Sequence, residues 1–249
     1  MHRGWGDDPV TATDLAREML GGDVSPAHRI DRATSGVLVF ARRREAAQAL
    51  ARMFEEGAVE KTYLALVRGD PPDEGVIDHP IPRREGGPRV PATTRFLVRA
   101  RGRDVAPAEL PPDIRRVSLV EARPLSGRLH QVRRHLKHLS HPLIGDANYG
   151  KGALNRMFAE AIDLRRLALH ALATRLVHPD TGEPITFTAK VPPDLAEPLA
   201  RLGMDPGFLQ GGKPPRITPP TDETAAETGA DPGLRPGLGG AVLDNVDQR

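Results

Sequence analysis

The 249-residue chain contains no cysteine. This absence excludes disulfide bonds, thiolate metal sites and a cysteine nucleophile. The chain also lacks any apolar run that approaches the ~18 residues of a membrane span, and its N-terminal residues have no signal-peptide core. We therefore expect a cytoplasmic protein that does not insert into a membrane.

One segment lacks negative charge. Over the whole chain, 35 Lys and Arg residues nearly balance 33 Asp and Glu residues, and the formal net charge is +2. Between Ala122 and Gly145 no acid occurs, while four histidines and five other basic residues do: Arg123, Arg128, Arg133, Arg134 and Lys137. Such a local basic block predicts a face that binds anions or nucleic acid.

Asp31 lies in the stretch around which the chain is organised, Ala27-His-Arg-Ile-Asp-Arg-Ala-Thr-Ser-Gly36. Two flanking arginines, Arg29 and Arg32, should keep this carboxylate ionised well below neutral pH. An ionised carboxylate in a cleft can act as a nucleophile or a base. The alternative is a surface turn, in which the Asp and Ser side chains cap backbone donors.

Hydrophobic periodicity and turn residues divide residues 1–210 into helices and strands. We expect helices over 12–20, 44–56, 127–139, 155–165 and 193–202, and strands over 36–41, 60–68, 76–77, 94–100, 116–122, 167–177 and 185–190. This irregular alternation predicts an α+β fold with a mixed sheet. Two long loops, 70–92 and 102–113, are candidates for substrate contact.

The composition changes beyond residue 210. Residues 211–249 are rich in glycine and proline and have few large apolar side chains. Such a segment cannot bury enough surface to offset its ordering entropy. We expect one catalytic domain over 1–210, followed by a disordered tail over 211–249.

Three motifs, in this order, resemble those of the RNA pseudouridine synthases of the large-subunit rRNA pseudouridine synthase A family. They are His28-Arg-Ile-Asp-Arg-Ala-Thr-Ser-Gly36, similar to HRLDxxTSG; Lys61-Thr-Tyr-Leu-Ala65, similar to K-x-Y-x-A; and Gly127-Arg-Leu-His-Gln-Val-Arg-Arg-His135, similar to GRTHQIRxH. The turn Gly145-Asp-Ala-Asn-Tyr-Gly150 is similar to the family's GDxxYG, which we interpret as structural. The resemblance covers roughly residues 1–200 and is greatest to the tRNA pseudouridine synthase C type.

The resemblance implies roles for three residues. Asp31 would be the catalytic nucleophile, and Tyr63, one of only two tyrosines, would lie against the target base and take part in proton removal from the ring. Arg133 would pair with Asp31, since a guanidinium fork can orient a carboxylate and keep it charged. Leu129 replaces the family's small hydroxyl residue, which affects one local hydrogen bond. If Arg133 does not fill the role, Arg128 is the alternative.

The resemblance also implies the reaction and the fold. The protein would isomerise a uridine in structured RNA, in the T-stem of tRNA or in rRNA, to pseudouridine without a cofactor. The uridine would leave its stack at a cost of a few kcal/mol, and Arg29 could fill the vacated space. We expect a largely antiparallel sheet, a monomer, and RNA-binding residues Arg29, Arg32, Thr34, Arg128, His130, Arg134 and Lys137.

Two other functions compete with this interpretation. A metal-dependent nuclease would use the histidines at 130, 135, 138 and 141, but their spacing does not suit a metal and HExxH is absent, so we expect no metal site. Chelator insensitivity would argue against that enzyme. A non-catalytic RNA-binding protein with the same fold would bind tRNA but form no pseudouridine under single-turnover conditions.

The beginning of the chain departs from the family pattern. Relatives usually carry a strand, a turn and a Lys-Pro-x-Gly motif before the segment that corresponds to His2-Arg-Gly-Trp5. Without that strand, a sheet edge would be unpaired. We therefore expect that an N-terminal strand of the family fold is missing, and that either the true start codon lies upstream or the chain is truncated.

Overall fold

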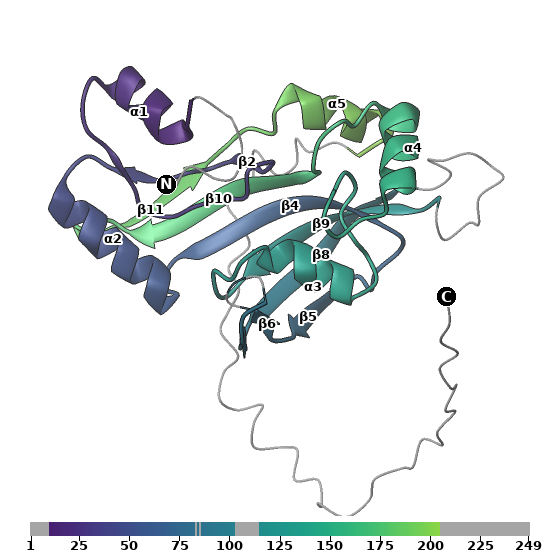
Figure 1. Ribbon diagram of the computed structural model, residues 1–249, viewed down its shortest axis with the longest axis horizontal. Coiled ribbons are helices and arrows are strands. Elements are labelled where there is room, and N and C mark those ends of the chain that lie inside the picture. Colours follow the sequence, from purple (N-terminus) through teal and green to yellow (C-terminus); the bar gives the residue numbers. More distant parts are fainter. Residues whose placement is uncertain (1–9, 83, 85, 103–114, 205–249) are drawn as a thin grey trace, which may run out of the picture. The chain divides into compact units, whose positions relative to one another are not determined.

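The computed structural model describes residues 10–82, 84, 86–102 and 115–204, drawn in colour in Figure 1. Residues 1–9, nearly all of the predicted 102–113 loop and the predicted tail lie outside these ranges. The helices are α1 (Ala12–Leu20), α2 (Arg44–Glu56), α3 (Gln131–His138), α4 (Gly152–Ile162) and α5 (Pro193–Arg201). The longer strands are β4 (Glu60–Arg68), β5 (Glu74–Asp78), β8 (Thr93–Gly102), β9 (Val117–Pro124), β10 (Leu169–Val177) and β11 (Pro184–Thr188). Five strands have two residues each: β1 (Ser25–Pro26), β2 (Ser35–Gly36), β3 (Phe40–Ala41), β6 (Ile81–Pro82) and β7 (Arg89–Val90).

A seven-stranded sheet forms the centre of the described structure. Six strands run antiparallel in the order β11-β10-β4-β9-β8-β5, and the short β2 pairs in parallel with β10. On β4, Tyr63 pairs with Ala122 of β9 on one side and with Ala171 of β10 on the other. The predicted α+β fold with a largely antiparallel sheet is confirmed.

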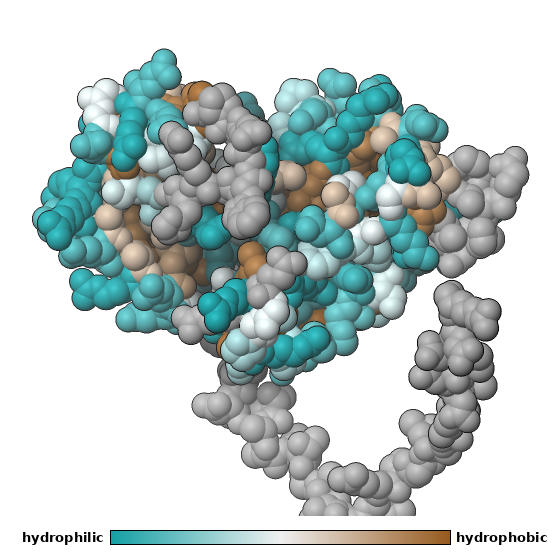
Figure 2. Space-filling view, in the orientation of Figure 1, coloured by the Kyte–Doolittle hydropathy of each residue, from teal (hydrophilic) through white to brown (hydrophobic). Residues whose placement is uncertain are grey.

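The two faces of this sheet pack against different helices, as Figure 1 shows. On β4, Leu64 and Leu66 point into a cluster with α4 and α5, whereas Ala65 and Val67 point into a cluster with α3. This alternation follows from the two-residue period of a strand. Hydrophilic side chains cover most of the described surface in Figure 2, with apolar residues in separate patches between them. No helix within the described ranges is long and apolar enough to cross a bilayer.

The apolar segment at 36–41 is not the single strand that its sequence predicts. Ser35 and Gly36 pair with β10, while Phe40 and Ala41 pair with β1. Between them, the Val39 N–H donates to the His28 imidazole at 3.0 Å. Val37, Val39 and Ala41 are buried, whereas Gly36, Leu38 and Phe40 are only partly buried. The segment divides because its backbone donors find three different partners.

Helix α3 begins at Gln131, later than the predicted start near Gly127. The Gln131 side chain accepts hydrogen bonds from the Ser126 hydroxyl at 2.8 Å and the Arg128 backbone N–H at 3.0 Å. His130 then adopts a left-handed conformation with φ 52° and ψ 34°. The segment 126–130 is therefore a loop folded against the first residue of the helix, and it brings His130 away from the helical faces.

Candidate active site

An open cavity of about 870 Å³ lies where the Asp31 loop, α2, β4 and the start of α3 meet. Its lining includes seven of the ten residues that the sequence predicts for the site: Arg29, Asp31, Thr34, Tyr63, Arg128, His130 and Arg133. Segments more than a hundred residues apart in sequence, such as those of Asp31 and Arg133, thus contribute to one cavity. Arg32, Arg134 and Lys137 are not part of this lining.

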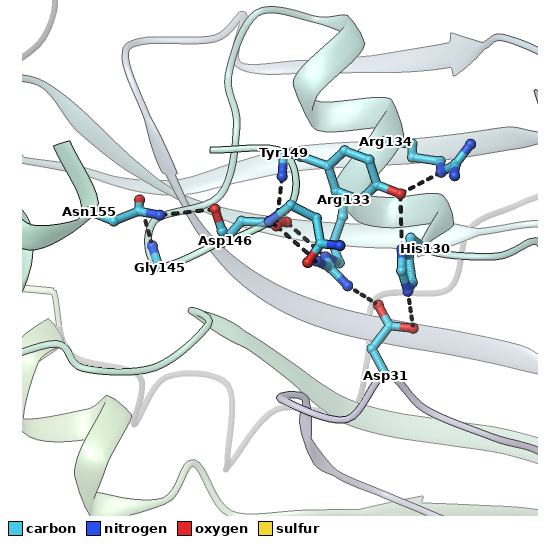
Figure 3. Close-up of polar contacts among 9 residues, drawn as sticks. Asp31, His130, Arg133, Arg134, Gly145, Asp146, Tyr149 and Asn155 are labelled. Carbon is cyan, nitrogen blue, oxygen red and sulfur yellow. Dashed lines mark hydrogen bonds and ion pairs between the residues drawn. The ribbon is translucent and has the colours of Figure 1, made fainter. Parts of the chain in front are cut away.

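Asp31 contacts Arg133, as the resemblance implies. The Arg133 Nη1 donates to Asp31 Oδ2 at 3.1 Å, and His130 Nε2 lies 3.9 Å from the other carboxylate oxygen, Oδ1 (Figure 3). The Asp31 side chain remains 23% exposed. The carboxylate is thus held on one side and open to the cavity on the other.

Arg133 is buried and has a second carboxylate partner. Its Nε and Nη2 donate to the two oxygens of Asp146 at 2.7 and 2.8 Å, and Nη2 also donates to Asn148 Oδ1 at 3.2 Å. Burial alone would lower the pKa of the guanidinium, but the hydrogen bonds and charges of Asp146 and Asp31 raise it above its ordinary value. Arg133 is therefore permanently charged, with its orientation fixed by Asp146.

Asp146 is fully buried at the centre of the 145–150 turn. Besides Arg133, its Oδ1 accepts the backbone N–H groups of Asn148 and Tyr149, both at 2.9 Å. Burial raises the pKa of this carboxyl, but the hydrogen bonds from Arg133 and the backbone outweigh burial and lower it. Gly145 is required here, because φ is +74° and a Cβ would lie 1.9 Å from the Arg166 carbonyl oxygen.

The 145–150 turn therefore has a role that the sequence interpretation missed. We interpreted its GDxxYG pattern as structural only, yet Asp146 and Asn148 orient the arginine that holds Asp31. One signal was present in the sequence. Asp146 is the first acid after the acid-free segment at 122–145, where a buried basic residue needs a counter-charge.

Tyr63 lines the cavity from β4. Burial and the nearby charge of Asp31 raise the pKa of its phenol to about 12. The side chain is therefore neutral at physiological pH, and it offers an uncharged flat ring close to the carboxylate.

Lys61 is a further cation of the cavity that the sequence interpretation did not include among the site residues. It is buried, and its Nζ donates to the Ser126 carbonyl at 3.0 Å. Burial and the charge of Arg128 lower the pKa of this amine to about 8. Together with Arg29 and Arg128, it gives the cavity lining positive charge that suits a phosphate.

The remaining predicted RNA-binding residues lie outside the cavity lining. Arg32 is exposed on the turn after Asp31. Arg134 and Lys137 lie over the Tyr149 ring, with 5.4 Å from Arg134 Cζ and 5.7 Å from Lys137 Nζ to its centre. Among the described residues, no group of three or more His, Asp or Glu side chains is arranged to hold a metal ion.

Comparison with known proteins agrees with this geometry. The family model for RNA pseudouridylate synthase matches residues 3–138. The chain therefore belongs to the RNA pseudouridylate synthase family, and it is an RNA pseudouridine synthase, an isomerase that acts on uridine in RNA.

Individual relatives match over most of their length. The chain is 38% identical over 215 residues to a protein named tRNA pseudouridine synthase C from Salmonella typhimurium, covering 82% of each chain. A protein of the same name from Vibrio parahaemolyticus is 36% identical over 222 residues, with 82% of this chain and 88% of the relative covered. The solved structure of human RNA pseudouridylate synthase domain containing 1 superposes with a TM-score of 0.62 at 28% identity, covering 84% of this chain and 88% of that one. The resemblance inferred from the three motifs is confirmed.

Proposed function

We propose that this enzyme converts a uridine of tRNA to pseudouridine and that Asp31 is the group that attacks the substrate. The observation that carries the proposal is the position of Asp31, which is held through one oxygen by buried Arg133 at the edge of a cavity that Tyr63 also lines. The choice of tRNA rests on the names of the similar proteins from Salmonella typhimurium and Vibrio parahaemolyticus.

In this proposal a uridine leaves its stack and enters the cavity, whose volume of about 870 Å³ admits a nucleoside. Its base packs against the neutral Tyr63 ring, because an aromatic ring offers a flat surface for stacking. The cationic groups of Arg29, Lys61 and Arg128 contact the neighbouring phosphates. Arg29 occupies the space that the uridine vacates.

Asp31 then attacks either C1′ of the ribose or the pyrimidine ring. The N1–C1′ bond breaks, the base turns, a C5–C1′ bond forms, and the bond between Asp31 and the substrate breaks again, which restores the free carboxylate. C5 gives up one proton and N1 ends with one, so the product has the same atoms as the substrate. The reaction consumes no oxidant, reductant or phosphoryl donor.

Asp31→Asn tests the proposal. It keeps the shape of the side chain but removes the charge and the nucleophile. We expect the single-turnover rate of pseudouridine formation on a tRNA transcript to fall by at least about 10³-fold. The Kd for the same RNA should change by less than about threefold, since phosphate contacts supply most of the affinity.

Asp23→Asn is the matched control, because the Asp23 side chain is fully exposed, its carboxylate lies 3.5 Å from the Arg17 guanidinium, and it is not part of the Asp31 cavity lining. It should leave both quantities unchanged. Turnover by Asp31→Asn at more than a tenth of the wild-type rate would refute Asp31 as the attacking group. Tight binding by the wild-type protein without pseudouridine formation in any tRNA would refute the choice of substrate.

A further inference from the structure

His130 has a backbone conformation that its residue type does not favour. Its φ of 52° and ψ of 34° lie in the left-handed region, which costs a residue with a Cβ on the order of 1 kcal/mol or more. Strain of this kind persists where surrounding contacts over-determine a conformation, as functional sites often do. Here it directs the imidazole into the cavity, between Tyr149 on one side and Asp31 on the other (Figure 3).

The hydrogen bonds at Tyr149 restrict where protons can lie. The Arg134 Nε can only donate, and it lies 2.7 Å from the Tyr149 oxygen, which must therefore accept. The same oxygen lies 2.9 Å from His130 Nδ1. Since the phenol has one proton, that proton can bridge to Nδ1 only when Nδ1 is an unprotonated acceptor.

The other neutral tautomer of His130, with the proton on Nδ1, has unfavourable contacts on both sides of the ring. With the proton on Nδ1, the Tyr149 oxygen would accept two hydrogen bonds and its own O–H would lose its partner in this network. The bare lone pair of Nε2 would then face the Asp31 carboxylate, an anion, at 3.9 Å. With the proton on Nε2, Tyr149 donates to Nδ1 and an N–H faces Asp31 Oδ1.

We propose that His130 is a positioning residue for Asp31, held by Arg134 and Tyr149 as the tautomer whose Nε2–H faces Asp31 Oδ1. The inference rests on the proposed role of Asp31. Arg133 holds Oδ2 at 3.1 Å, and His130 limits the rotation of the carboxylate by attracting Oδ1. The 3.9 Å between His130 Nε2 and Asp31 Oδ1 is too long for a hydrogen bond in the free enzyme, but such contacts often shorten when substrate fills a site.

The charged groups around His130 agree with a neutral ring. Asp31 faces it from its own loop, Arg133 and Arg134 from α3, and Asp146 from the 145–150 turn. Burial lowers the pKa of the His130 imidazole, and the two arginines lower it further against the opposing effects of the two carboxylates. A neutral imidazole carries one proton, so the choice between the two ring nitrogens is meaningful.

The first test reads the tautomer directly. In ¹⁵N-labelled protein at pH 7.5, the His130 side-chain nitrogens, identified by their loss in His130→Gln, should show the pattern of a neutral ring protonated at Nε2. In Tyr149→Phe, the proton should redistribute and the Nδ1–H form should become detectable. A wild-type ring that is protonated at Nδ1, or at both nitrogens, would overturn the proposal.

The second test separates the two ring nitrogens by activity. Gln places its amide N–H₂ near the position of Nε2, whereas Asn places its polar groups near Nδ1. We expect His130→Gln to keep at least about a third of the single-turnover rate, and His130→Asn to lose about 10–50-fold, with the Kd for RNA within about twofold. Tyr149→Phe should lose about 3–10-fold.

His178→Gln is the control, because His178 lies in the β10–β11 turn, where its Nδ1 accepts the local backbone N–H groups of Asp180 and Thr181. It should have the wild-type rate. Equal losses in His130→Gln and His130→Asn, or a weaker Kd with an unchanged rate, would show a phosphate contact and overturn the inference. If Asp31→Asn is inactive while His130→Asn is fully active, this inference fails and the proposed function stands. If Asp31→Asn is active, the proposed function itself fails.

Discussion

The two sides of the cavity are held in different ways. On the Arg133 side, the side chains of Leu136, His135 and Asp146 are fully buried. His135 bridges the Thr94 hydroxyl and the His79 carbonyl, at 2.7 and 2.9 Å. On the Asp31 side, the segment is attached by the two-residue strands β2 and β3 and by smaller apolar residues that retain slight exposure, such as Val37 and Val39.

This contrast suggests how the enzyme places its reactive carboxylate. A loop with few backbone bonds can move most easily, and buried networks with complete hydrogen bonding move least. Arg133, on the better-held side, contacts Asp31 on the other. We infer that α3 and the 145–150 turn fix the position of Arg133, and that the Asp31 carboxylate takes its position from its contact with Arg133.

The largest loss of stability and activity should come from Asp146→Asn, which removes the buried carboxylate partner of Arg133. The variant would leave the buried Arg133 guanidinium without its bidentate counter-charge. We expect the free energy of unfolding to fall by about 3–5 kcal/mol, and the rate of pseudouridine formation to fall by at least about 100-fold at a temperature where the variant is folded. Urea unfolding and single-turnover assays would measure both.

Asp163→Asn is the control for charge removal. Asp163 is half-exposed, pairs with Arg165 at 3.1 Å, and has a left-handed φ of 58° that Asn tolerates. It should change stability by no more than about 1 kcal/mol. If Asp146→Asn lowered the free energy of unfolding no more than Asp163→Asn does, the Arg133 side would not be the more firmly held side of the cavity.

Gly36→Ala should have the next largest effect, on the Asp31 side. Gly36 has φ +113°, and a Cβ there would lie 2.1 Å from the Ala171 carbonyl oxygen. We expect a loss of about 2–3 kcal/mol in the free energy of unfolding, together with slower catalysis, because β2 must move away from β10. Gly22→Ala, where a Cβ meets nothing within 4 Å, should be neutral. Full activity of Gly36→Ala would show that β2 does not set the position of Asp31.

A smaller effect should appear when the pH falls, through His28. Burial lowers the pKa of this imidazole from 6.5 to about 4, and its Nε2 must stay unprotonated to accept the Val39 N–H. The unfolded chain therefore binds the proton more readily, so this contribution to stability is complete above pH 6.5 and is lost as the pH falls toward 4. Relative to His28→Gln, wild type should lose about 2 kcal/mol more in the free energy of unfolding between pH 7.5 and about 5. If the free energy of unfolding of wild type and of His28→Gln changed equally with pH, the predicted contribution of His28 would be contradicted.

The smallest effect on stability should come from Thr34→Val. The Thr34 hydroxyl is buried in the cavity lining and has no hydrogen-bond partner among the described residues. Because removing an unsatisfied polar group costs little, the free energy of unfolding should stay within about 1 kcal/mol of wild type or rise. A fall in the rate on tRNA without a loss of stability would show that the hydroxyl contacts the substrate. An unchanged rate would remove Thr34 from the binding residues.

Much of the architecture was predictable because the pattern of apolar residues already states which face is buried. The helix over 12–20 was expected, and the structure forms it over Ala12–Leu20 with a capping box of Thr11 and Asp14. Helix α2 spans Arg44–Glu56, the range that the sequence predicts. Periodicity failed where a side chain replaced a backbone partner, as His28 does within the 36–41 segment and Gln131 does before α3.

The sequence by itself determined the family, the order of elements and the residue types of the site, because motif spacing and two-residue or 3.6-residue periods are properties of the chain. Only the tertiary structure decided how those residues act together. In the fold, Asp146 pairs with Arg133, and the Tyr149 hydroxyl lies between His130 and Arg134. The physical reason is burial: a charge removed from water must find its counter-charge in space, and the fold decides which carboxylate lies within reach.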